Sequence, residues 1–208
     1  MFLYIFVIGF TMLLVFCGNA FWAPIDYSIL KISLLTLMLP ILMIAWDGIS
    51  ATFIRRALPE KWFTKDVKFH NVSKAECKLY EFFGIKLWKD HVLELGMFTS
   101  FSKKKVSNPN DPEYISRFIL ESNYGYQIHL WNFILGILPF FFFPREIGIR
   151  FILPAFAANS ILSILPMMIL RYNIPRLKRL LTVVEKKSAL YASRQNQNLE
   201  KPEALREK

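Results

Sequence analysis

The sequence is poor in the residues that soluble catalytic and metal-binding motifs require. Its 208 residues include only two cysteines and three histidines, with no CxxC pair and no Cys/His spacing typical of zinc ligands. Cys17 falls in an apolar run and Cys77 in a basic segment, so we expect no disulfide between them. A glycine-rich phosphate loop, a GxSxG elbow and an HExxH helix are also absent. These absences exclude the familiar soluble chemistries and give no reason to expect a cofactor or a metal.

Apolar residues, by contrast, are abundant. They make up 54% of the chain and include 20 Phe, which predicts an all-α membrane protein. Four runs are apolar and long enough to be transmembrane helices: 2–22, 28–54, 126–143 and 148–170. The short connections between them predict two hairpins, formed by spans one and two and by spans three and four. The first run has no basic region before it and no small-residue cleavage site, which favours a true span over a cleaved signal peptide.

The basic residues are distributed unevenly along the chain. Residues 55–125 hold thirteen Lys and Arg, the segment from Arg171 onward holds ten, and the remaining stretches hold three. Two spans separate the two basic segments, so both lie on one side, and the positive-inside rule makes that side cytoplasmic. We therefore expect a multi-pass protein of a cell membrane with both termini cytoplasmic. Attraction to anionic lipids accounts for the net charge of +10, and no nucleic-acid partner is expected.

Four segments follow from this organisation: a transmembrane hairpin at 1–54, a cytoplasmic basic segment at 55–125, a second hairpin with a basic amphipathic helix at 126–187, and a disordered tail at 188–208. Interfacial amphipathic helices are expected between spans two and three and after span four. Ser73, with Glu76 three residues later, predicts a helix start, and Gly84 predicts a split into two helices. Asp111 and Pro112 predict another helix start, and Gly125 a break before span three.

His129 is the leading candidate for a catalytic base. It lies in "YGYQIHLWN" near the start of span three, where an ionisable residue is costly and suggests function; the alternative is a neutral histidine that packs against a neighbouring helix. Its carboxylate partner is Glu121 or Asp90. In an unbroken helix Glu121 would lie about 12 Å away along the axis, too far for contact. Asp90 alternatively pairs with a neighbouring lysine, Lys86 or Lys89.

Asp47 is a further acid, near the inner end of span two. It is either functional or neutralised by Arg55 or Arg56.

The end of span four carries a polar cluster in "MMILRYNIPRLKRLL". Pro175 lacks an N–H and disfavours helix at the residue before it, so we expect the span to end there, with Arg171 and Asn173 at a fixed depth. The cluster faces either His129 or lipid headgroups. The following basic helix, with Arg176, Lys178 and Arg179, suits an anionic surface.

Five segments together resemble a known family: "LPEKWF", "KLWKD", "RFILES", "IHLWN" and "FAANSILSILPMMILRYNIPRLKRLL". They are similar to the glycosyl-4,4'-diaponeurosporenoate acyltransferases, membrane enzymes that complete staphyloxanthin-type carotenoids, over about residues 58–187. The resemblance implies transfer of a fatty acyl chain from a thioester donor such as acyl-CoA to a sugar hydroxyl on a glycosylated carotenoid acid. The acyl thioester is a co-substrate, and membrane lipids surround both reactants.

For such a reaction, our hypothesis assigns roles to the candidate residues. His129 would deprotonate the sugar hydroxyl, and Glu121 or Asp90 would stabilise the imidazolium. Arg171 and Asn173 would face the thioester oxygen or the sugar. The donor phosphates would bind Arg176, Lys178 and Arg179. Two alternatives remain: a non-catalytic four-span scaffold that binds other membrane enzymes of a pathway, and an enzyme that modifies another isoprenoid or glycolipid.

Overall fold

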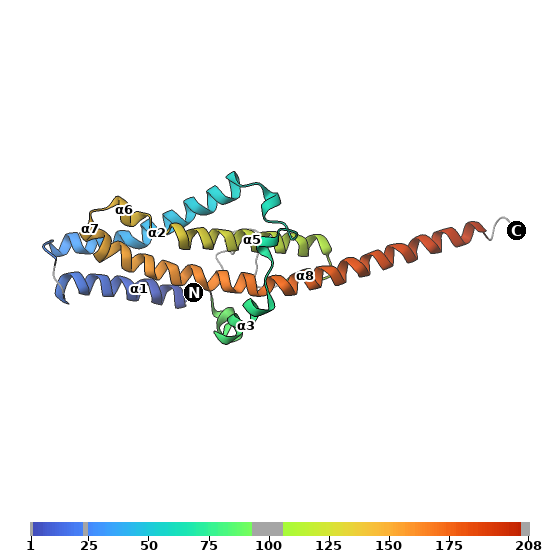
Figure 1. The fold of residues 1–208 in the computed structure, drawn as a ribbon, viewed down its shortest axis with the longest axis horizontal. Helices are drawn as coiled ribbons and strands as arrows, with labels where there is room; N and C mark the ends of the chain where they lie inside the picture. The colour runs from blue at the N-terminus through green and yellow to red at the C-terminus, as the bar shows by residue number, and fades with distance from the viewer. Residues whose placement is uncertain (1, 23–24, 93–105, 205–208) are drawn as a thin grey trace.

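The computed structural model describes residues 2–22, 25–92 and 106–204, and every regular element in these ranges is a helix (Figure 1). The elements follow one another as α1 (Phe2–Cys17), η1 (Gly18–Trp22), α2 (Ile29–Ala57), η2 (Glu60–Trp62), η3 (Lys68–His70), α3 (Lys74–Phe82), α4 (Ile85–Trp88), η4 (Lys89–His91), α5 (Pro112–Leu135), α6 (Pro139–Phe142), α7 (Arg145–Ile147), η6 (Gly148–Ile152) and α8 (Leu153–Ala204). The all-α prediction is confirmed.

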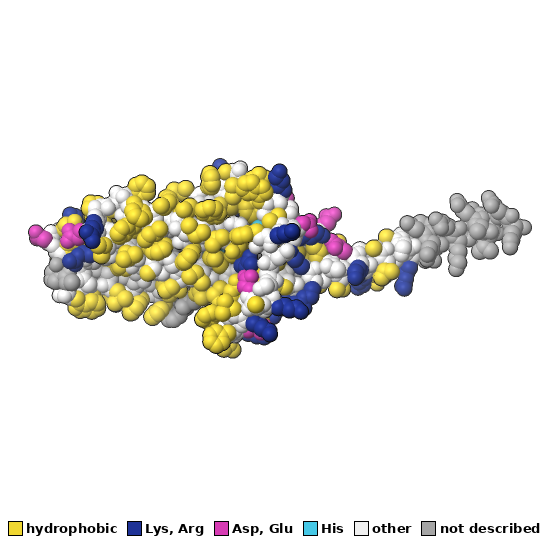
Figure 2. All heavy atoms as spheres, viewed as in Figure 1, with side chains coloured by type: hydrophobic (Ala, Val, Ile, Leu, Met, Phe, Trp, Pro, Cys, Tyr) yellow, Lys and Arg dark blue, Asp and Glu magenta, His cyan; other side chains and the backbone are white. Residues whose placement is uncertain are grey.

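Three helical stretches are long and apolar enough to cross a membrane within the described ranges: Tyr4–Trp22, Ile29–Ala57 and Arg145–Gln195. Their large apolar side chains are widely exposed, as lipid-facing side chains are in membrane proteins. In Figure 2 such side chains cover the part of the body formed by α1, α2 and the start of α8, and Lys and Arg gather where α8 leaves the body. The predicted third span, 126–143, is not among the three: α5 ends at Leu135, and its second half carries the polar residues Gln127, His129 and Asn132.

Helix α5 is continuous, so the predicted break at Gly125 is wrong. A glycine inside a helix costs about 1 kcal/mol relative to alanine. Packing outweighs this cost, since Ile115 and Ile119 of α5 form a buried cluster with Ile174 and Leu177 of α8. The two helices run antiparallel along each other, with their opposite ends meeting where Gly136 approaches Phe156.

Helix α8 continues through Pro175, so the helix end predicted there is also wrong. A proline inside a helix costs roughly 3 kcal/mol. Ile174, Leu177 and Leu181 flank it on the side that faces α5, and burial of each such side chain contributes about 1.5–3 kcal/mol. Burial of these three side chains together offsets the free-energy cost of the proline. The same helix runs on to Ala204 where the sequence predicted disorder, so α8 projects far beyond the rest of the protein (Figure 1).

The short helices between α2 and α5 begin where local signals place them. Ser73 Oγ accepts a hydrogen bond from the Glu76 backbone N–H at 3.0 Å, and Asp111 Oδ1 accepts one from the Glu113 N–H at 2.9 Å. Gly84 separates α3 from α4 with φ of 68°, a left-handed conformation that favours glycine. The predicted caps at Ser73 and Asp111 and the predicted split at Gly84 are confirmed.

Candidate active site between α1, α2, α5 and α8

A cavity of about 760 Å³ lies between α1, α2, α5, α8 and the short η4. Its volume falls in the range of small-molecule and cofactor sites. On α8 the lining runs from Ala155 to Asn173, which is about 27 Å of helix at 1.5 Å per residue. A hydrocarbon core is about 30 Å thick, so the cavity is long enough to hold an extended lipid chain.

The wall formed by α1 and α2 is largely apolar. Helix α1 contributes Tyr4, Ile5, Ile8, Thr11 and Met12 to it. Helix α2 contributes mainly Leu39, Pro40, Met43 and Ile44, followed by Asp47 and, two turns later, Arg55. This side of the cavity is suited to a hydrocarbon chain, because most of its lining atoms neither donate nor accept hydrogen bonds.

The wall formed by α5 is more polar and includes the predicted base. Gly125, His129 and Asn132 all line the cavity, and their spacing of four and three residues puts them on one face of the continuous helix. Helix α8 adds Asn159, Ser163 and, at the far end, Asn173. Polar side chains from α5 and α8 thus meet a lining that is otherwise largely apolar.

Three predicted site residues meet in this cavity: His129, Asp90 and Asn173. Asp90 belongs to η4, which places Lys89, Asp90 and Val92 against the end of the cavity where Arg55 also lies. We call Arg55 and Lys89 the basic end of the cavity. Pairing of Asp90 with Lys86 was one prediction, but Lys86 forms its ion pair with Glu81, at 2.9 Å.

Glu121 is not among the lining residues of the cavity. Its carboxylate accepts a hydrogen bond from Arg55 Nη2 at 2.8 Å, and the Arg55 guanidinium also lies over the Tyr124 ring at 5.2 Å from its centroid. Because α5 has no break, Glu121 stays eight residues, or about 12 Å, from His129. Of the two acids predicted to partner His129, Asp90 lines the same cavity and Glu121 does not.

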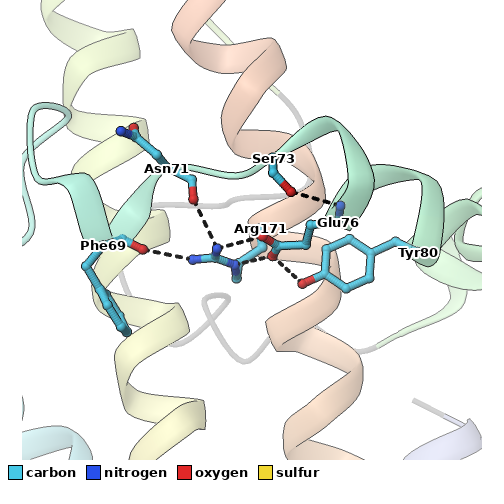
Figure 3. A network of polar contacts seen from close by, with 6 residues as sticks. All are labelled: Phe69, Asn71, Ser73, Glu76, Tyr80 and Arg171. Carbon is cyan, nitrogen blue, oxygen red and sulfur yellow. Dashed lines mark hydrogen bonds and ion pairs between the residues drawn. The ribbon is translucent and has the colours of Figure 1, made fainter.

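Arg171 of α8 lies outside the cavity. It binds the segment that connects η3 to α3 and the first turn of α3, and so holds this connecting segment against α8 (Figure 3). Its guanidinium pairs with both oxygens of Glu76, with Nη2 to Oε2 at 2.8 Å, and donates to the carbonyl oxygens of Phe69 and Asn71, each at 3.2 Å. Tyr80 donates its hydroxyl to the same carboxylate at 2.5 Å. Burial raises the pKa of Glu76, but the hydrogen bonds from Arg171 and Tyr80 outweigh it and leave that pKa lowered. We call these contacts the Arg171 clamp.

The three basic residues predicted to bind phosphate also lie outside the cavity lining. Arg176 donates to the Tyr172 hydroxyl at 2.8 Å, and that hydroxyl donates to Glu81 at 2.7 Å. Lys178 donates to the Lys65 carbonyl oxygen and to Asn71 Oδ1. Arg179 is exposed and donates to the carbonyl oxygen of Pro175, one turn before it.

Asp47 accepts a hydrogen bond from Asn159 Nδ2 at 3.3 Å, whereas the sequence suggested Arg55 or Arg56 as its partner.

The sequence did not predict that Asn132, Asn159 and the two residues of the basic end line the cavity. The spacing of Asn132 from His129 was a usable signal, because residues three apart share a helix face. No such signal existed for Asn159 or Arg55, whose positions depend on how α2 and α8 pack.

Metal ligation has no support within residues 2–22, 25–92 and 106–204: no three His, Cys, Asp or Glu residues there group closely enough to hold an ion.

In comparisons with known proteins, the family model described as glycosyl-4,4'-diaponeurosporenoate acyltransferase matches residues 59–183. No curated protein and no solved structure matches the chain. The matched segment includes Asp90, His129 and Asn173, and it leaves out α1 and α2.

Proposed function

The chain belongs to the glycosyl-4,4'-diaponeurosporenoate acyltransferase family, and on that premise we propose that it moves a fatty acyl chain from a thioester donor to a sugar hydroxyl of a glycosylated carotenoid acid. The family indicates an acyltransferase of carotenoid biosynthesis, and the apolar helices indicate a membrane protein. Acyl-CoA or a similar thioester is the donor, and no resident cofactor takes part. The reaction takes place at the cytoplasmic interface.

One observation supports this proposal most strongly: a single cavity, whose lining extends about 27 Å along α8, combines an apolar wall with His129. Both reactants have a long hydrocarbon part and a polar head, so they need such a cavity. The reacting hydroxyl and thioester lie where the polar and apolar parts meet. His129, on the polar wall, is at that boundary.

His129 acts as the general base. It takes the proton of the sugar hydroxyl as the hydroxyl oxygen forms a bond to the thioester carbonyl carbon. The carbon–sulfur bond then breaks, and the proton passes to the departing sulfur, so that the products are a sugar ester and a free thiol. Asp90 stabilises the imidazolium from the basic end of the cavity, and Asn173 donates its side-chain amide to the carbonyl oxygen.

Arg55 and Lys89 bind the phosphates of the donor, because among the described residues they are the cations that line the cavity. Exposed Arg176 and Arg179 on α8 extend this basic surface beyond the cavity. Arg171 has a positioning role: the Arg171 clamp fixes the connecting segment that leads on to Lys89 and Asp90.

Four crossings with both termini in the cytoplasm fit this chemistry. The second half of α5 together with α6 makes the third crossing, and the start of α8 makes the fourth. Support comes from the concentration of Lys and Arg around the part of the body from which α8 projects (Figure 2). The basic end of the cavity then opens towards cytoplasmic acyl-CoA.

The test uses purified protein in lipid nanodiscs with labelled acyl-CoA and a glycosylated carotenoid acid. We expect His129→Ala to lose at least about 100-fold in kcat, the lower range for general base catalysis. His91→Ala is the matched control, because His91 is exposed in η4 and does not line the cavity. Equal rates for wild type and His129→Ala would reject the base assignment, and the absence of transfer by wild type would favour the scaffold alternative.

A further inference from the structure

The polar wall of the cavity contains a side chain with an unsatisfied hydrogen-bonding group. Asn132 is 2% exposed, and its Oδ1 has no hydrogen-bond partner among the residues that the structure describes. An unpaired buried carbonyl oxygen destabilises the folded protein, so native proteins seldom retain one without a reason. Because Asn132 lines the cavity, rotation of its carboxamide presents either the oxygen or the NH₂ group to a ligand there.

Asp47 and Asn159 add a second polar feature on the facing helices. Asn159 is 8% exposed and donates to Asp47, and both side chains line the cavity. Asp47 lies eight residues before Arg55, or about 12 Å from the basic end along α2. An acid at this depth in an apolar span is costly and marks a functional position. The proposed mechanism gives Asp47 no task.

These groups form one cluster with mixed hydrogen-bonding capacity. Ser163 is 2% exposed and lies one turn from Asn159 on α8, and Asn132 lies one turn from His129 on α5. The cluster thus offers a carboxyl group and a hydroxyl beside two carboxamides, each of which both donates and accepts. A bound cation would interact with the oxygens alone and would make no use of the amide NH₂ groups. A ligand with several hydroxyl groups satisfies both kinds.

We propose that Asp47, Asn132 and Asn159 form the subsite that binds the sugar hydroxyls of the acceptor. This inference rests on the proposed function and names the residues that select a glycosylated acceptor. With the sugar held there, one hydroxyl lies beside His129, one turn along the same face of α5, while the carotenoid chain follows the apolar wall. Asp47 lies outside the matched family segment, so α2 supplies part of the acceptor specificity.

The test measures binding directly, so that it does not depend on turnover. Quenching of tryptophan fluorescence gives Kd for the glycosylated carotenoid acid and for the same acid without its sugar, in nanodiscs. We expect wild type to bind the glycosylated form about tenfold more tightly, as a few hydrogen bonds to a sugar would allow. In Asp47→Asn and Asn132→Leu that ratio falls towards one, and Kd for the unglycosylated acid is unchanged. Thr52→Val keeps the wild-type ratio, because the Thr52 hydroxyl is exposed, donates to the Gly48 carbonyl oxygen within α2 and belongs to a residue outside the cavity lining.

Unchanged Kd for the unglycosylated acid also shows that a variant is folded. The proposal is overturned if both variants keep the wild-type ratio, or if wild-type binding depends on Na⁺ and Asp47→Asn abolishes that dependence, which would make the cluster a cation site. A preserved sugar preference with no acyl transfer by wild type would reject the proposed function and leave the subsite standing. Acyl transfer without any sugar preference in binding would reject the subsite alone.

Discussion

Arg55 of α2 and Glu121 of α5 form an ion pair with 2.8 Å between Nη2 and Oε2, which joins a transmembrane helix to the helix that carries His129. The ion pair engages Glu121, one of the two carboxylates that the sequence suggested as a partner for His129. It also fixes Arg55 at the basic end of the cavity. Asp90, which comes from a different element, shares the cavity with His129 instead.

This arrangement predicts different consequences for the two acids. Asp90→Asn should lower kcat by about 10- to 100-fold, because the imidazolium loses its charged partner. Glu121→Gln should change kcat by less than about threefold and instead raise KM for the donor, because Arg55 is no longer held in place. Steady-state kinetics with acyl-CoA separates the two parameters. A large fall in kcat for Glu121→Gln, with Asp90→Asn unaffected, would reverse the assignment.

The Arg171 clamp should contribute measurably to stability. Its side chains are 13% and 22% exposed for Arg171 and Glu76, and loss of one partner leaves the other largely buried. We expect Arg171→Met to cost about 2–3 kcal/mol in the free energy of unfolding and to speed proteolysis between residues 64 and 82. Lys65 and Glu185 form the control pair, because at 39% and 46% exposure they should contribute less than about 1 kcal/mol. Double-mutant cycles for both pairs give the comparison, and equal coupling energies would contradict it.

Stability should fall in mild acid because of His70. Its side chain is 1% exposed, and Nε2 lies 3.0 Å from the Trp62 carbonyl oxygen. Burial lowers the pKa of His70, the contact with the Trp62 carbonyl oxygen opposes this, and the positive charges of Arg171 and Lys178 lower it further. A histidine with a depressed pKa in the folded state does not reduce the free energy of unfolding at a pH above its unfolded pKa of 6.5. Below that pH the free energy of unfolding decreases as the pH falls through the folded pKa.

The melting temperature of wild type should therefore decline below pH 6.5, whereas His70→Asn should show a smaller decline over the same range. Thermal denaturation in matched detergent from pH 7.5 to 4.5 makes the comparison, and His91→Ala is the control with an exposed histidine. Parallel curves for wild type and His70→Asn would show that another group titrates.

The apolar length of the cavity should select the acyl chain of the donor. Ala158 of α8 lines the cavity, and its neighbour Ala157 is exposed and does not. Ala158→Phe should shorten the space, so that the preferred acyl chain loses a few methylene groups, each worth about 0.8 kcal/mol of burial. Competition between acyl-CoA donors of different length reports the preference, for which Ala157→Phe should match wild type. A shift in both variants would point to a general disturbance of α8.

Local signals predicted local features well. Ser73 and Asp111 cap helices because a side-chain oxygen next to free backbone N–H groups needs no distant partner. Gly84 likewise separates α3 from α4 through its own backbone conformation. The expected breaks at Gly125 and Pro175 failed, because the penalty at each residue is local whereas the packing of α5 on α8 that outweighs it involves residues about sixty positions apart.

By itself, the sequence determined that the chain is helical and apolar enough to cross a membrane, that its basic residues concentrate in two segments, and that His129 is an unusual residue in its setting. These properties follow from composition and from neighbours within a few turns. Only the tertiary structure decided that Asp90 and Asn173 share a cavity with His129, that Glu121 pairs with Arg55, and that Arg171 binds Glu76. Those partners come from separate elements, and their meeting depends on the directions in which packed helices place their side chains.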